Sequence, residues 1–587
     1  MNRVSGKPMG AGVLPAGAAW MGRWSRRNTW SLLPAGAMWV LFCAVVPVGP
    51  ARGGQEASLT ASGEVDGAVR QYAGTEDEAG YHEVVQRVFL TGTGGPWTLG
   101  LEAKGVGVGP WSEDQEPPVE LLSPGMSGLF GDASALVLEK VMVRYRVRGL
   151  DLALGDFGAS LGRGMALNLV PNPDLDINAT LMGLRVRADR GPIRAEAAAG
   201  LAHPQIISLR YPNEWLLPPP RDLVQVLRVG VTPVPGLSLD AWTSRFSFED
   251  HWEPPAPVQE RTLSPDARVF GGAFEWRDLL GAADVYLEAN QLRYLSEEWF
   301  PDIDSTGYTV YGSVTTYLGA WTGLLEAKRY LNAEAINVRG GQYGYEYVTP
   351  PTLELAEAVT RDSAETIDSP NIVGYHLRLD RFLAASDSVW TLSWSHFYDL
   401  DPKPPTPSKE TIGHLYTGWE WNPAGGGRIA AIAGYRMDVR SVRSHGEDRT
   451  FHASLSLESP PWGKMAVSLH ALARRFQQTD EDDPLAYSDA DVSAAVIYDG
   501  RYTAGLRWQY TDDPVLLNNP SLGGGEGNLL FLSRYHFGSM WLEWRPVQGA
   551  GLVLFAGARR AGLECGGGQC RFVPSFRGVE LSGWFQF

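Results

Sequence analysis

Arginines alternate with apolar residues in two neighbouring stretches of this chain, residues 141–148 and 184–189. The arginines at these positions and just beyond the second stretch are Arg144, Arg146, Arg148, Arg185, Arg187 and Arg194. Because successive side chains of a β-strand point to opposite faces, each stretch predicts one cationic and one apolar face. Lining a pore, such guanidinium rows would attract anionic solutes. Alternatively, they would brace the wall by pairing with nearby carboxylates, and the sequence leaves both interpretations open.

Residues 332–370 form a long polar stretch that offers acidic counterparts to these arginines. A segment rich in helix-favouring residues follows Pro350 and Pro351. We assign three carboxylates to a candidate constriction loop, Glu346, Glu354 and Glu357. If the stretch folds into a wide barrel, it narrows the lumen; if it folds outward, it is a solvated external loop.

Cys565 and Cys570 are the cysteines of the exported part of the chain, and they flank a Gly-Gly-Gly-Gln segment between two predicted strands. In an oxidising compartment this spacing suits a disulfide that closes a hairpin loop. Two thiols without a nearby histidine make a poor zinc site. We therefore predict a disulfide, no metal site and no cofactor.

The sequence contains no Gly-x-Ser-x-Gly, no His-Glu-x-x-His and no phosphate-binding-loop motif. His396, His414, His452 and His470 fall at strand positions, where we expect most of them to be ordinary polar residues that face a lumen. The sequence thus predicts no catalytic residue and no enzyme activity.

The last nine residues show which elements position these side chains. Val579, Leu581, Gly583, Phe585 and Phe587 share one face, and polar residues and Trp584 share the other. This alternation is typical of a strand with lipid on one side and water on the other. The ending resembles the C-terminal strand of bacterial outer-membrane β-barrel proteins, which stops in an aromatic residue. The resemblance implies an outer-membrane barrel that the barrel-assembly machinery recognises through the strand ending at Phe587.

Alternating runs recur along the chain. The clearest are residues 193–201, 283–290, 451–458 and 465–474, whereas residues 223–232 and 528–545 keep the pattern imperfectly. Short turn-like breaks alternate with longer polar connections, as expected for short periplasmic turns and long extracellular loops. We predict an all-β fold: a single transmembrane antiparallel β-barrel of about 24 strands, in a range of roughly 20 to 26.

Residues 1–51 are typical of an N-terminal extension with a cleaved secretory signal peptide. Arg23, Arg26 and Arg27 precede the apolar residues 32–46, and small residues at 49–51 offer a cleavage site. Translation that begins at Met21 would give a conventional signal. The apolar run of about 15 residues is too short for a membrane-spanning helix. We expect residues 52–587 to form the barrel in the outer membrane.

Charge and aromatic content narrow the function. The chain has 50 basic and 67 acidic residues, and its first 51 residues hold five of the basic and none of the acidic ones, leaving a net charge of −22. This acidity argues against nucleic acid as a partner. The 21 Trp suit membrane interfaces. An aromatic-rich soluble β-sandwich array, or a carbohydrate-binding one, is the alternative fold.

A second resemblance lies in residues 154–167. Gly155-Asp156-Phe157 and Gly162-Arg163-Gly164 are similar to a motif of certain poorly characterised outer-membrane barrels, in which a strand ends in Gly-Asp-aromatic and a Gly-Arg-Gly turn follows; the similarity extends towards residues 178–183. Arg163 either pairs with Asp156 at a tight strand-to-loop transition or contacts a substrate at the pore mouth.

The function we predict is a porin or channel for passive or substrate-selective diffusion of small polar solutes, with outer-membrane lipid and lipopolysaccharide as its surroundings. The alternative is a non-conducting barrel that acts in surface adhesion or envelope assembly through its extracellular loops.

Overall fold

The computed structural model describes most of the chain beyond residue 59. The described ranges are 60–72, 81–110, 134–172, 177–203, 222–247, 266–294, 306–333, 336, 347–348, 371–400, 411–439, 447–479, 485–513, 536–560, 562–566, 569–573 and 576–587. The regular elements in these ranges are strands. None of the described residues belongs to a helix long and apolar enough to cross a membrane. Residues 1–51, with the predicted signal peptide, lie outside the described residues, so that prediction stays a prediction.

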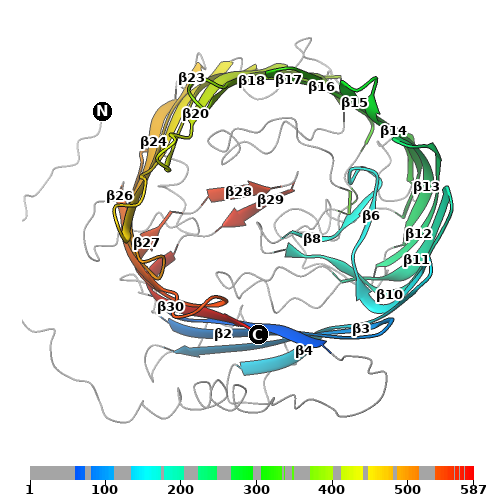
Figure 1. Ribbon diagram of the computed structural model, residues 1–587, viewed down its shortest axis with the longest axis horizontal. Helices are drawn as coiled ribbons and strands as arrows, with labels where there is room; N and C mark the ends of the chain where they lie inside the picture. The colour runs from blue at the N-terminus through cyan, green and yellow to red at the C-terminus, as the bar shows by residue number, and fades with distance from the viewer. Residues whose placement is uncertain are drawn as a thin grey trace, which may run out of the picture. The chain divides into compact units, whose positions relative to one another are not determined.

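Twenty-four strands form one antiparallel sheet that closes into a ring (Figure 1). The first half of the ring consists of β1 (Thr60–Tyr72), β2 (Tyr81–Gly94), β3 (Trp97–Pro110), β4 (Ser134–Val147), β5 (Leu150–Phe157), β10 (Thr180–Arg190), β11 (Ile193–His203), β12 (Leu223–Val234), β13 (Leu237–Ser247), β14 (Ala267–Leu279), β15 (Ala283–Tyr294) and β16 (Thr306–Leu318). The second half consists of β17 (Trp321–Leu331), β18 (Ile372–Leu383), β19 (Ser388–Asp399), β20 (Thr411–Trp421), β21 (Arg428–Val439), β22 (Glu447–Glu458), β23 (Met465–Thr479), β24 (Leu485–Tyr498), β25 (Tyr502–Thr511), β26 (His536–Trp544), β27 (Ala550–Arg559) and β30 (Phe576–Gln586). The prediction of a single antiparallel barrel of about 24 strands is confirmed.

The C-terminal strand β30 closes the ring against β1. Gly63 and Phe587 exchange two backbone hydrogen bonds of 2.9 and 3.0 Å at the end of this pairing. A side chain at Gly63 would meet the Phe587 ring, because a Cβ there would lie 2.5 Å from Phe587 Cζ. Closure pairs both edges of the sheet, which would otherwise offer unpaired backbone groups.

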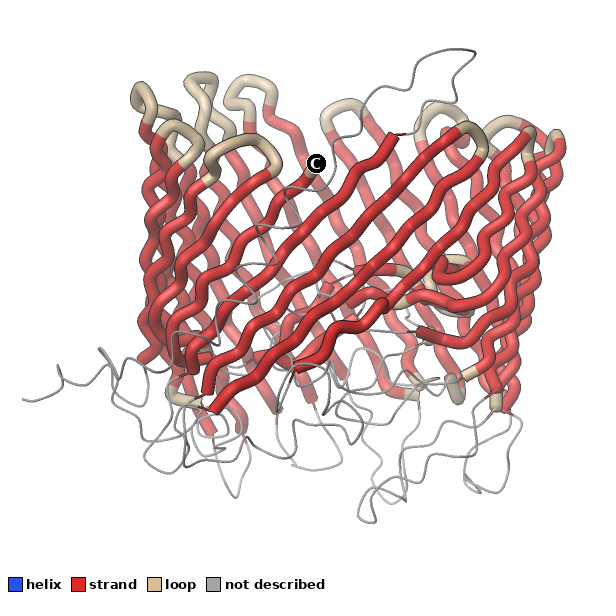
Figure 2. Tube along the Cα trace, turned by 90° about the horizontal axis from the view of Figure 1, so that it is seen from below, coloured by secondary structure: helices blue, strands red, loops and turns tan. Residues whose placement is uncertain are grey.

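The two faces of the sheet differ as the alternation predicts. In β15, Leu287 points outward and is 51% exposed, whereas its neighbour Glu288 points inward and is buried. At the C-terminus, Val579 and Leu581 of β30 and the following Phe587 are exposed on the outer face. The strands are inclined to the axis of the ring (Figure 2), as closure of a barrel requires. The sheet therefore presents an apolar outer surface and a mainly polar inner one.

The connections differ in length at the two ends of the ring. Those that follow β2, β4, β10 and the later strands of the same direction span two to six residues. Those at the opposite end span five to forty residues, of which many lie outside the described residues. We refer below to the short-turn end and the long-loop end.

Two of the long connections contain short strands of their own. Between β5 and β10 lie β6 (Ala159–Leu161), β7 (Leu167–Leu169), β8 (Pro171–Asn172) and β9 (Ile177–Asn178). Between β27 and β30 lies a hairpin of β28 (Gly562–Gly566) and β29 (Gln569–Val573). Figure 1 draws both groups within the outline of the ring.

Candidate functional site

The connection between β5 and β10 folds into the barrel, and we call its residues 158–172 the insert. Leu161, Met165, Leu167 and Leu169 of the insert are fully buried. The three leucines pack with inward side chains of β12 to β15, among them Val224, Phe246, Val269 and Leu292. Met165 belongs to a second apolar cluster, with Tyr311 of β16 and Tyr330 of β17. The inner wall is thus apolar where the insert packs on it. Burial of each such side chain stabilises the insert by roughly 1.5–3 kcal/mol.

Gly155 and Asp156 fix the root of the insert. Gly155 has a φ of +92°, and a Cβ there would lie 2.0 Å from the Val141 carbonyl oxygen, so only glycine fits. The Asp156 carboxylate accepts hydrogen bonds from the Val141 backbone N–H at 3.0 Å and the Thr180 hydroxyl at 3.2 Å. It also contacts His203 Nδ1 at 2.8 Å. These contacts hold the end of β5, where the chain leaves the wall, and the start of β10, where it returns.

Arg163 fixes the tip of the insert on β15 and β16. Its backbone N–H donates to Glu288 Oε2 at 2.9 Å, and its Nη1 donates to the Tyr311 hydroxyl at 2.9 Å. The guanidinium carbon lies 4.3 Å from the centre of the Tyr286 ring. The pairing of Arg163 with Asp156 that the sequence suggested is therefore wrong. The motif residues sit at two ends of one insert, and each end contacts a different part of the wall.

Tyr311 continues this contact along the inner wall. Its hydroxyl donates to Glu326, which contacts His376 Nδ1 at 2.9 Å. His376 Nε2 lies 2.8 Å from the Ser393 hydroxyl. The polar chain thus runs from Arg163 across β16, β17, β18 and β19, and it makes the tip of the insert part of the wall.

Residues from the predicted constriction loop also reach the insert. The Asn168 N–H donates to the Tyr347 carbonyl oxygen at 2.7 Å, and the Tyr347 N–H donates to Ile336 at 2.9 Å. The Tyr347 hydroxyl donates to Asp222 at 2.6 Å. The three assigned carboxylates, Glu346, Glu354 and Glu357, lie outside the described residues, so their place in a constriction stays a prediction.

A row of alternating charges crosses the inner wall nearer the short-turn end. The register places Arg146 opposite Asp151, Asp151 opposite Arg187, Arg187 opposite Glu196, and Glu196 opposite Arg228. Directly opposed unlike charges on one face of a sheet stabilise it by about 0.2–1 kcal/mol per pair. Asp151, Glu196 and Arg228 are not among the site residues predicted from the sequence, because their roles depend on a register that spacing alone does not give.

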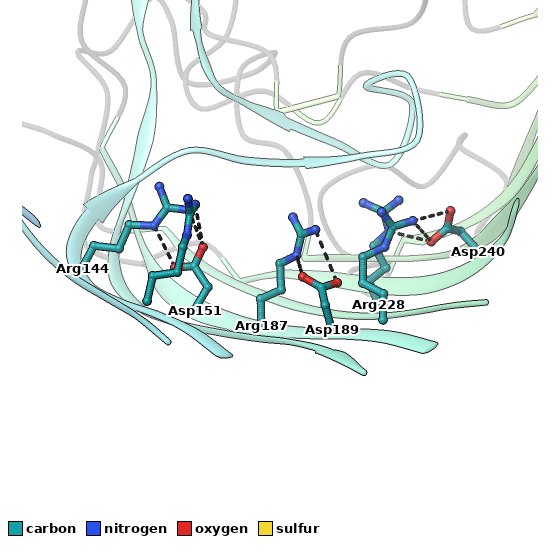
Figure 3. A network of polar contacts seen from close by, with 8 residues as sticks. Arg144, Asp151, Arg187, Asp189, Arg228 and Asp240 are labelled. Carbon is teal, nitrogen blue, oxygen red and sulfur yellow. Dashed lines mark hydrogen bonds and ion pairs between the residues drawn. The ribbon is translucent and has the colours of Figure 1, made fainter. Parts of the chain in front are cut away.

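Ion pairs tie these and neighbouring side chains together on the concave side of the wall (Figure 3). Asp151 accepts from Arg144 Nε at 2.8 Å and from Arg146 Nη2 at 3.2 Å. Asp240 accepts from Arg228 Nε at 2.9 Å and from Arg194 Nη2 at 3.2 Å. A further pair joins Arg187 and Asp189 at 3.0 Å. Arg146 remains 64% exposed and Arg187 39% exposed, so both stay accessible to water while paired.

The other two predicted arginines have different surroundings. Arg185 donates to the Gly158 carbonyl oxygen at 3.0 Å and lies over the Phe157 ring, so it supports the root of the insert. Arg148 lies in the exposed turn after β4 with a φ of +34°, so the structure places it at the short-turn end and not in a strand.

The remaining residues singled out in the sequence are two cysteines and four histidines. The register of β28 and β29 pairs Cys565 with Cys570 directly. His414 and His452 face inward and lie 2.9 Å apart through their Nε2 atoms, and His470 contacts Ser456 at 2.9 Å. His396, in contrast, lies among Tyr375, Trp394 and Tyr398. Within the part of the chain that the structure describes, no group of three or more His, Cys, Asp or Glu is arranged to hold a metal ion.

A closed antiparallel barrel with an apolar outer surface and charge rows inside defines a transmembrane β-barrel.

No family model matches the chain, and no curated protein matches it. Among solved structures, the barrel is similar to the translocation pore of the P pilus usher PapC, with 9% identity, 90% of this chain and 99% of that chain covered, and a TM-score of 0.42. It is also similar to the outer-membrane protein OpdK from Pseudomonas aeruginosa, with 12% identity, 67% and 97% of the chains covered, and a TM-score of 0.36. A third similar structure is OprD from Pseudomonas aeruginosa, with 11% identity, 72% of this chain and 94% of that chain covered, and a TM-score of 0.33.

Proposed function

We propose that this chain is an outer-membrane channel through which small polar solutes diffuse. The observation that carries the proposal is the charge row on the inner wall, from Arg146 through Asp151 and Arg187 to Arg228. Charged side chains that point into a barrel keep water there and act on dissolved ions, whereas a bracing role alone does not require Arg146 to be 64% exposed. No covalent chemistry is part of this proposal.

The width of the ring makes the insert necessary. Barrels of 16 to 18 strands already leave an aqueous channel, and wider ones need their lumen filled. The insert fills one sector of a ring of 24 strands and is held at both ends. The β28–β29 hairpin and the carboxylates of residues 332–370 are proposed as further narrowing elements. A disulfide between Cys565 and Cys570 would stiffen the hairpin.

The charge balance of the wall predicts the kind of selectivity. Six arginines and four carboxylates face this sector, namely Arg144, Arg146, Arg185, Arg187, Arg194, Arg228, Asp151, Asp189, Glu196 and Asp240. The local excess of positive charge favours small anions, although the chain as a whole is acidic. The surrounding membrane and the assembly machinery that would recognise the strand ending at Phe587 are the partners this proposal requires.

The experiment is single-channel recording of the refolded chain from Arg52 in a planar bilayer. Arg146→Gln/Arg187→Gln removes two exposed charges of the row, and Arg148→Gln removes a charge of the same kind in the turn. We expect the wild type to conduct and the double variant to lose about half or more of its anion preference, with Arg148→Gln unchanged. A well-folded barrel without current refutes the channel. Equal selectivity of all three proteins refutes the role of the row.

A further inference from the structure

Four outward arginines lie close to the long-loop ends of neighbouring strands. They are Arg245 in β13, Arg268 in β14, Arg293 in β15 and Arg329 in β17. Each stands between two buried inward residues; Arg329, for example, lies between Lys328 and Tyr330, which are 2% exposed. Since side chains alternate along a strand, the four guanidinium groups point away from the lumen.

Three of these arginines are direct neighbours across the sheet. The register pairs Arg245 with Arg268, and Arg268 with Arg293. Like charges directly opposite each other on one face of a sheet are destabilising. A row of this kind therefore favours an anion that lies between the side chains.

Within the described part of the chain, no carboxylate supplies that anion to these side chains. Among the described residues, Arg245, Arg268, Arg293 and Arg329 form no ion pair and no side-chain hydrogen bond, and Arg268 Nε is buried without an acceptor. Two outward arginines at the same end of other strands have acceptors of their own. Arg449 pairs with Glu447 at 2.8 Å, and Arg475 donates to the Ser488 hydroxyl at 2.7 Å.

The arginines mark the edge of the apolar outer surface. In β14 the outward residues run from Trp276 through Phe274, Gly272 and Phe270 to Arg268. Eight residues span about 26 Å along an inclined strand, which gives a band of roughly 20 Å between the ends. Such barrels present an apolar band of about 25 Å, so the arginines lie close to its edge, near the level of lipid headgroups.

We propose that Arg245, Arg268, Arg293 and Arg329 bind the phosphate groups of lipid A, the phosphorylated anchor of lipopolysaccharide in the outer leaflet. The planar guanidinium forms two parallel hydrogen bonds to a phosphate, and all four positions carry arginine and not lysine. Phe270 and Tyr308 on the same outer face contact the acyl chains below. The site rests on the proposed outer-membrane location and not on passage of solutes, so a barrel that carries no current still tests it.

The experiment is native mass spectrometry of the refolded chain from Arg52 in detergent, titrated with bisphosphorylated lipid A. The probes for comparison are the same lipid without its phosphates and phosphatidylglycerol. Arg268→Gln/Arg293→Gln is the test variant, and Arg449→Gln/Arg475→Gln is the matched control on the other side of the barrel. We expect the test variant to bind lipid A at least about tenfold more weakly than the wild type, and the control to bind it equally well.

The wild type alone tests the lipid A site, even if a variant folds poorly. The wild type must prefer lipid A to its dephosphorylated form by about tenfold or more, because phosphate is the group recognised. Equal affinity for the two forms, equal affinity for phosphatidylglycerol, or an equal loss in both double variants overturns the assignment.

Discussion

Replacement of Arg163 by alanine tests whether the insert is held as the structure indicates. The variant loses the hydrogen bond from Nη1 to the Tyr311 hydroxyl and the contact with the Tyr286 ring, but it keeps the backbone bond to Glu288. A hydrogen bond from a charged donor contributes roughly 1.5–3 kcal/mol, and a cation–π contact about 0.5–1 kcal/mol or more. A loss of about 3 kcal/mol raises the population of the detached insert about 100-fold, since each 1.4 kcal/mol is tenfold.

Hydrogen exchange followed by mass spectrometry measures this population directly. The amides of Gly164 and Asn168, which donate to Leu161 and Tyr347, exchange when the tip of the insert detaches. Their exchange should accelerate about 100-fold in Arg163→Ala, while peptides of the barrel strands stay protected. Arg187→Ala is the control, because it removes an exposed pair worth about 0–1 kcal/mol away from the insert. Exchange that rises by less than about threefold in Arg163→Ala would refute the clamp and leave apolar burial as the whole cause of attachment.

Two glycines make further predictions. Gly155→Val should disrupt the root of the insert, because the backbone has a φ of +92° and Val141 leaves no room for a Cβ. We expect the free energy of unfolding, measured by denaturant titration, to fall by about 2 kcal/mol or more. Gly92→Ala is the control, because a Cβ at Gly92 meets open space. Gly63→Leu should displace the Phe587 ring and slow closure of the barrel, measured as a smaller heat-modifiable folded fraction on gels, and unchanged folding would contradict the contact.

The barrel was predictable from the sequence, whereas the insert left only an indirect signal there. Alternation at residues 283–290 and in the last strand reports directly which face meets lipid, so it revealed the fold without knowledge of tertiary contacts. Residues 223–232 departed from that pattern, and β12 shows the physical reason. Leu227 faces outward, whereas Val224 and Val226 face inward and are buried under the insert. A strand that is apolar on both faces of a barrel indicates that protein covers its inner side, and this was the signal for the insert.

The arginine pattern predicted strands of the barrel wall, but it did not reveal the carboxylates that pair with these arginines. Those partners follow from the register between neighbouring strands. Asp151 lies opposite both Arg146 and Arg187, although they are five and 36 residues away in sequence. Carboxylates alternate with the guanidinium groups along the row. Because each arginine lies next to an acidic residue, repulsion among the arginines is small. In the proposed channel, a solute would meet alternating local fields on this wall, with the insert rooted on the same strands nearer the long-loop end. The two interpretations of the arginine row, bracing and selection, are therefore compatible: the pairs that brace the wall are also those that set the direction of the field.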